Sequence, residues 1–110
     1  MFMSRLETLL GFLEEDPQDG FTRFAIAQEY HKLGRTEDAI RVLQGLIDTQ
    51  PAYVGAYYHL GKLYEEQGFS KKAEEVYQLG IQFAEQEGSF HDKAELQNAL
   101  MSLRYDPDDD

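Results

Sequence analysis

The chain has 110 residues and a formal net charge of −11, and its hydrophobic content of 42%, with seven Phe and seven Tyr, is sufficient for a folded core. The absence of cysteine excludes disulfides and thiolate metal sites, and the negative charge disfavours nucleic acid and anionic membranes as partners. No apolar run approaches the ~18 residues of a membrane span and the N-terminus lacks the pattern of a signal peptide, so we expect a cytoplasmic protein.

The first expected element is an amphipathic helix over residues 2–15. Leu6, Leu9, Leu10 and Leu13 fall on one stripe of this helix, flanked by Phe2 and Phe12, as expected for a face that packs against a neighbour. Pro17 ends it, because the residue before a proline is pushed out of helical geometry.

Two segments of similar design follow, and each is expected to form a pair of helices. Gly34 and Gly68 end the first helix of each pair, since glycine accepts the left-handed conformation found after helix C-termini. Asp19, Thr36 and Ser70 are expected to be N-cap residues because their side chains can accept a backbone hydrogen bond. The segments are residues 17–50, with helices expected at 20–33 and 37–49, and residues 51–87, with helices expected at 53–67 and 71–86.

A last helix is expected at residues 89–104. We expect it to present Phe90, Ala94, Leu100 and Leu103 to the rest of the fold, with Leu96 and Ala99 alongside and with a polar outer face that closes the end of the domain. Residues 106–110 form an acidic tail that contains four of the aspartates.

The two helix pairs share a pattern that repeats every 34 residues. Tyr57, Leu60, Gly61 and Tyr64 reproduce the aromatic, Leu-Gly and Tyr spacing of one known repeat, and the chain therefore resembles the tetratricopeptide repeat family. The resemblance implies an all-α solenoid of antiparallel helix pairs: a single domain, residues 1–105, with two full repeats, an N-terminal half-repeat helix and a C-terminal capping helix. The matching residues are Pro17 and Pro51, Tyr30 and Tyr64, Gly34 and Gly68, Ala39 and Ala73, and Val42 and Val76.

The same resemblance implies a concave groove, lined by the first helices of the repeats, that binds a partner peptide or helix. Phe24 and Tyr58 occupy equivalent positions of the two repeats and are the central candidates. A packing role is the alternative for Phe24, and Phe21 is expected to contact the first helix of the chain. We expect a neutral or basic, apolar partner. The positions carried over are Phe21, Phe24, Gln28, His31, Tyr58, Lys62 and Glu65.

The titratable residues do not form a pattern that indicates catalysis. The three histidines lie on three different expected helices, and adjacent acidic pairs such as Glu65 and Glu66 point in directions ~100° apart. We therefore expect no enzyme activity, no metal and no cofactor. The favoured function is an adaptor for protein–protein interaction; the alternatives are a homodimer formed through the terminal helices and a domain of a longer protein.

Overall fold

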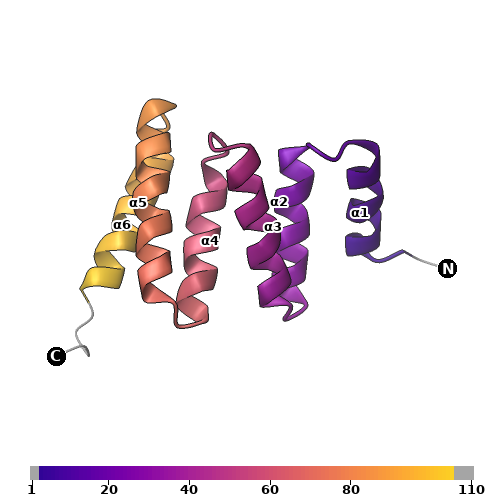
Figure 1. Cartoon of the computed structure of the whole chain (residues 1–110), viewed down its shortest axis with the longest axis horizontal. Helices are drawn as coiled ribbons and strands as arrows, with labels where there is room; N and C mark the ends of the chain where they lie inside the picture. Colours follow the sequence, from indigo (N-terminus) through magenta and orange to yellow (C-terminus); the bar gives the residue numbers. More distant parts are fainter. Residues whose placement is uncertain (1–2, 106–110) are drawn as a thin grey trace. The chain divides into compact units, whose positions relative to one another are not determined.

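The computed structural model describes residues 3–105, and Figure 1 shows that this part of the chain is helical without strands. Phe2 and the expected acidic tail, residues 106–110, lie outside the described residues. The chain divides after Gln50 into two compact units, with three helices in each. The helices are α1 (Arg5–Glu15), α2 (Gly20–Lys32) and α3 (Thr36–Thr49) in the first unit, and α4 (Gly55–Glu66), α5 (Ser70–Gln86) and α6 (Phe90–Arg104) in the second.

Helix α1 begins at Arg5, because Ser4 is its N-cap residue. The Ser4 hydroxyl accepts a hydrogen bond at 3.1 Å from the backbone N–H of Glu7, which satisfies one of the free donors of the first turn. The expected start at residue 2 therefore placed the helix too early. Buried Leu9 packs with Ala25 and Ile26 of α2, so part of the expected apolar stripe of α1 covers α2, but Leu10 of that stripe is exposed.

The turn between α2 and α3 depends on Gly34, whose φ of +77° is strained for any residue with a side chain. This conformation lets the N–H of Arg35 donate to the Tyr30 carbonyl at 2.8 Å, which satisfies a free carbonyl at the end of α2. The next helix then starts at Thr36, with Arg35 in the N-cap position and no side-chain cap. The expectation that Thr36 caps α3 is wrong, because the backbone turn already places Thr36 inside the helix.

The second unit repeats this turn between α4 and α5. Gly68 has a φ of +81°, and the N–H of Phe69 donates to the Tyr64 carbonyl at 2.8 Å. Ser70 is consequently the first residue of α5 and not its N-cap, for the same reason as Thr36. Tyr57, Leu60 and Tyr77 form the centre of this unit, each with no exposed surface.

Small residues allow the helices of the second unit to approach closely. A Cβ atom on Gly61 would lie 2.6 Å from Tyr77 Cζ, and one on Gly80 would lie 2.6 Å from Tyr57 Cβ. Both distances are below contact distance, so a tyrosine fills the space above each glycine. Small residues at these two positions therefore let the helices cross closely.

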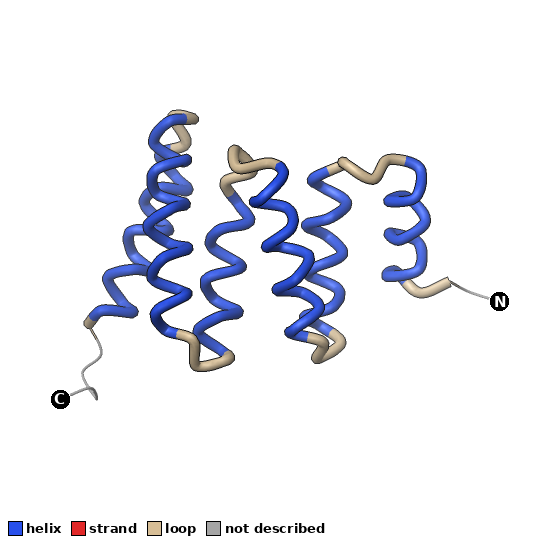
Figure 2. Tube along the Cα trace, viewed as in Figure 1, coloured by secondary structure: helices blue, strands red, loops and turns tan. Residues whose placement is uncertain are grey.

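Helix α6 lies beside α5, as Figure 2 shows, but only part of the set of residues expected to pack faces inward. Leu96, Ala99 and Leu100 are buried, whereas Phe90 is 72% exposed and Ala94 is also exposed. Residues 96, 99, 100 and 103 share one helical face, and residues 90 and 94 lie on the other side of the helix. None of the helices in the described part is long and apolar enough to cross a membrane.

Candidate functional site

The α2 part of the candidate site is one face of the helix, because Phe21, Phe24, Gln28 and His31 are spaced three, four and three residues apart. Phe24 is half-buried, and Gln28 and His31 are exposed. Phe21 is 69% exposed, so the expectation that it packs against the first helix is wrong. It is the second residue of α2, whereas the apolar contacts with α1 are made by Ala25 and Ile26 further along the helix.

The α4 part of the site is a connected set of three side chains. The ammonium of Lys62 lies 5.5 Å from the centre of the Tyr58 ring and 3.6 Å from the Glu65 carboxylate. All three residues are half-buried, so they are held by their neighbours and still present surface to solvent. The set offers an aromatic face, a cation and an anion within two turns of one helix.

Glu65 is also fixed from the neighbouring helix. The hydroxyl of Tyr77 on α5 donates a hydrogen bond to the Glu65 carboxylate. Burial of the phenol raises the pKa of Tyr77 well above its usual value, and the hydrogen bond to Glu65 and the charge of that carboxylate raise it further. The hydroxyl therefore remains a donor through the whole physiological range, and Glu65 is held in one orientation.

Tyr77 is a residue whose role at the site could not be read from the sequence. The repeat pattern predicts that Tyr77 is a buried aromatic residue of the second helix of the repeat, and its side chain is completely buried. Its hydroxyl reaches a carboxylate twelve positions earlier on another helix, and no local spacing indicates such a contact.

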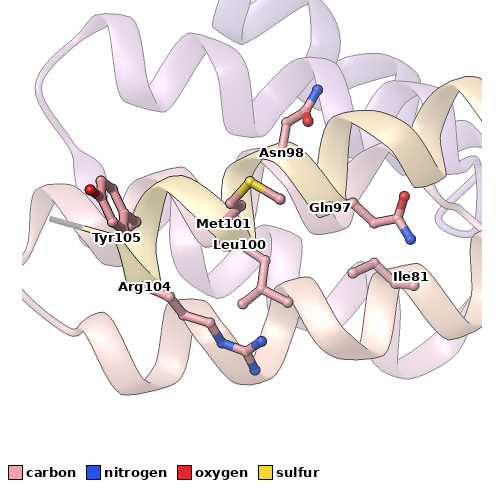
Figure 3. Close-up of a pocket in the computed structure, with 7 residues that line it drawn as sticks. All are labelled: Ile81, Gln97, Asn98, Leu100, Met101, Arg104 and Tyr105. Atoms are coloured by element: carbon pink, nitrogen blue, oxygen red, sulfur yellow. The ribbon is translucent and has the colours of Figure 1, made fainter.

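A surface groove of about 640 Å³ lies along α5 and α6, and Figure 3 shows its lining residues as sticks. Ile81 of α5 and Leu100 of α6 lie between the two helices in this view, and Tyr105 lies at the end of α6. Met101 is 67% exposed and Tyr105 is 80% exposed. The groove therefore offers apolar surface at the C-terminal helix of the second unit.

Among residues 3–105, no group of three His, Cys, Asp or Glu side chains could hold a metal ion. The candidate site combines aromatic rings, amides and a paired Lys and Glu, which is a set suited to contacts with another molecule.

Comparison with known proteins identifies the family. A TPR repeat model matches residues 27–68, and a tetratricopeptide repeat model matches residues 54–87. A tetratricopeptide repeat domain protein from Salinibacter ruber is similar to the chain in two solved structures, one from solution and one from a crystal. The identities are 44% and 43%, the TM-scores are 0.77 and 0.75, and the matches cover 80% and 78% of this chain and 89% and 96% of those chains.

Two further solved structures have the same fold. A protein from Bordetella parapertussis is 25% identical, with a TM-score of 0.79 over 94% of this chain and 90% of that chain. The type III secretion translocator chaperone SycD of Yersinia enterocolitica has a TM-score of 0.80 over 90% of this chain and 69% of that chain, but at 12% identity it supports the fold alone. No curated protein matches the sequence.

The chain belongs to the tetratricopeptide repeat family. The predicted all-α repeat fold is thereby confirmed. Repeats of this family generally serve protein–protein interaction, and this is the broad class of function with which the family match is consistent. That the seven candidate residues contact a partner stays a prediction.

Proposed function

We propose that the protein is an adaptor that binds a segment of a partner protein through the exposed faces of α2 and α4. The α4 set is the observation that carries the proposal. Lys62 contacts both the Tyr58 ring and Glu65, and the Tyr77 hydroxyl of α5 donates a hydrogen bond to the Glu65 carboxylate. A set that is already ordered loses less conformational entropy when a partner binds than flexible side chains would.

The partner segment that suits these faces is apolar and neutral or basic. Phe21 on α2 and Tyr58 on α4 offer aromatic surface, and aromatic side chains dominate the energetics of most interfaces. Lys62 is already paired with Glu65, so it is less available to an acidic segment. The chain's net charge of −11 also favours a basic partner at long range.

The test is affinity capture from the lysate of the source organism, with wild type beside two variants. The double variant Phe24→Ala, Tyr58→Ala removes one aromatic from each face, and Phe21→Ala removes a side chain that is mostly in solvent. We expect a partner that wild type retains and that the double variant binds at least tenfold more weakly, about 1.4 kcal/mol.

Leu79→Ala is the matched control, because Leu79 is 41% exposed and belongs to neither face. Circular dichroism must show the same helicity for all variants. Equal retention of the partner by wild type and the double variant, at equal helicity, would refute the proposed faces.

Self-association is a second candidate, and the groove along α5 and α6 favours it. Exposed Met101 and Tyr105 beside Leu100 are the kind of apolar surface that a second copy covers in a homodimer. We expect light scattering to show a dimer that dissociates on dilution, and the substitution Met101→Glu to give a monomer. A wild-type protein that stays monomeric at millimolar concentration would eliminate this candidate.

A further inference from the structure

A second exposed cluster lies at the turn between α4 and α5, which is drawn as a loop in Figure 2. We call Phe69, Lys71 and Lys72 the basic cluster. These residues line a surface cavity of about 600 Å³ together with Gly68, Ser70 and Glu75. Phe69 is 49% exposed and both lysines are exposed, so all three are accessible to another molecule.

The two lysines differ from most basic residues of the chain in having no acidic partner. The chain contains ten Lys and Arg residues, and seven of them form ion pairs. Arg23 donates instead to the Thr49 hydroxyl. Within the described residues, only Lys71 and Lys72 form neither an ion pair nor such a hydrogen bond. None of the acidic residues within 3–105 therefore forms an ion pair with either of these two adjacent lysines.

The first unit has the opposite charges at the equivalent turn. At the 34-residue offset, Lys71 is equivalent to Glu37 and Lys72 is equivalent to Asp38. This reversal of charge between the two repeats identifies the basic cluster in the sequence. Asp38 accepts hydrogen bonds at 2.8 Å from both Arg35 and Arg41. The bond from Arg35 is the main cause that holds the pKa of the Asp38 carboxyl below its usual value.

In the second unit an ammonium takes the place of that carboxylate. Lys72 lies 5.1 Å from the centre of the Phe69 ring and 5.7 Å from that of Tyr64. These contacts orient the lysine, but they do not neutralise it. Both lysines also lie in the first turn of α5, where the helix dipole disfavours cations. The fold alone therefore does not account for this choice of residues, because the first unit makes the same turn with acidic ones.

We propose that the basic cluster binds a short acidic segment of a partner protein. Carboxylates of the segment pair with Lys71 and Lys72, and an apolar side chain next to them covers the Phe69 ring. Glu75 at the edge of the cavity and the chain's net charge of −11 disfavour a long polyanion, so a nucleic acid is a poorer occupant than a peptide with a few acidic residues. This surface shares no residue with the proposed faces of α2 and α4.

The test uses an acetylated and amidated peptide, Glu-Glu-Leu-Glu-Glu, titrated into the ¹⁵N-labelled full chain at low ionic strength. We expect saturable shifts of the amide signals of Phe69, Lys71 and Lys72, which weaken when salt is added. The variant Lys71→Glu should bind the peptide at least tenfold more weakly. Lys32→Glu makes the same change of net charge at a lysine that pairs with Glu29, and it should change the affinity less than twofold.

A second variant separates binding from folding. Lys71→Gln with Lys72→Gln removes both cations from the first turn of α5 without adding a carboxylate near Glu75, so we expect a melting temperature close to that of wild type together with complete loss of peptide binding. The variant Phe24→Ala, Tyr58→Ala should bind the peptide normally, which keeps this result distinct from a failure of the proposed adaptor faces. The peptide Gln-Gln-Leu-Gln-Gln should not bind.

Three outcomes would overturn the proposal. Equal peptide binding by wild type and Lys71→Glu would show that the basic cluster is not the site. Binding of a short single-stranded DNA with the same affinity would show a general anion surface. A tenfold gain in peptide affinity on removal of residues 106–110 would identify the chain's own acidic residues as the occupant.

Discussion

The contact between Gly61 and Tyr77 gives the sharpest test of how the second unit is packed. The substitution Gly61→Ala would place a methyl group 2.6 Å from Tyr77 Cζ and still nearer to Tyr77 Cε1, which is a steric clash with the ring. The ring cannot move away at low cost, because Tyr77 is completely buried and its hydroxyl is bonded to Glu65. Forcing a methyl group into a packed core typically costs ~1–3 kcal/mol.

Helix propensity acts in the opposite direction. Alanine is favoured over glycine by about 1 kcal/mol in a helix interior, and a partial weakening of the Tyr77–Glu65 hydrogen bond adds a loss of about 1 kcal/mol, which is part of the ~1.5–3 kcal/mol of a hydrogen bond to a charged group. We therefore expect Gly61→Ala to lower the free energy of unfolding by ~1–3 kcal/mol. Urea unfolding followed by circular dichroism measures this change through the transition midpoint.

Two further variants make the reasoning refutable. Gly55→Ala adds a methyl group to the same helix where no atom lies within 4 Å, so we expect its stability to equal or exceed that of wild type. Tyr77→Leu removes the ring, so in that background Gly61→Ala should destabilise much less than it does alone. An unfolding midpoint of Gly61→Ala at or above that of wild type would show that Tyr77 does not fill this space.

Two more predictions concern single hydrogen bonds. The raised pKa of Tyr77 means that the folded state keeps the phenol proton above pH 10, where the unfolded chain loses it, so the free energy of unfolding should fall by about 1.4 kcal/mol per pH unit there. Tyr77→Phe should remove this contribution to the alkaline slope, as pH-dependent denaturation would show. Ser4→Ala should destabilise α1 by about 1 kcal/mol through loss of the N-cap, and faster amide hydrogen exchange at Glu7 would report it, whereas unchanged exchange would contradict it.

The repeat pattern predicts the helices well because it depends on a few positions with strict steric demands. Gly34 and Gly68 must adopt positive φ, and Gly61 must leave room for Tyr77, so these residues mark turns and crossings in the sequence itself. The exact start of a helix depends on weaker preferences. Thr36 and Ser70 looked like caps, but the backbone hydrogen bonds of the preceding turn place the helix start one residue earlier.

The candidate site could be predicted only in part, since its organisation depends on contacts between helices. The spacing of Tyr58, Lys62 and Glu65 correctly indicates one face of α4, and the contacts of Lys62 follow from that spacing. The bond from Tyr77 to Glu65 does not, because it requires the relative placement of α4 and α5. The exposure of Phe21 was also missed, because the apolar character of a side chain does not determine which side of a helix is covered.

The α2–α3 turn and the α4–α5 turn show which positions of the repeat are not constrained by the fold. In both units the turn is stabilised by a glycine and by a backbone hydrogen bond of 2.8 Å, from Arg35 to Tyr30 and from Phe69 to Tyr64. These interactions involve no side chain at the positions that follow. The fold therefore tolerates Glu37 in one unit and Lys71 in the other. The stability of the turn does not determine the charge at this position, so that charge can vary with the partner that is bound. This tolerance explains why the basic cluster can carry two lysines that form no ion pair with any residue of 3–105.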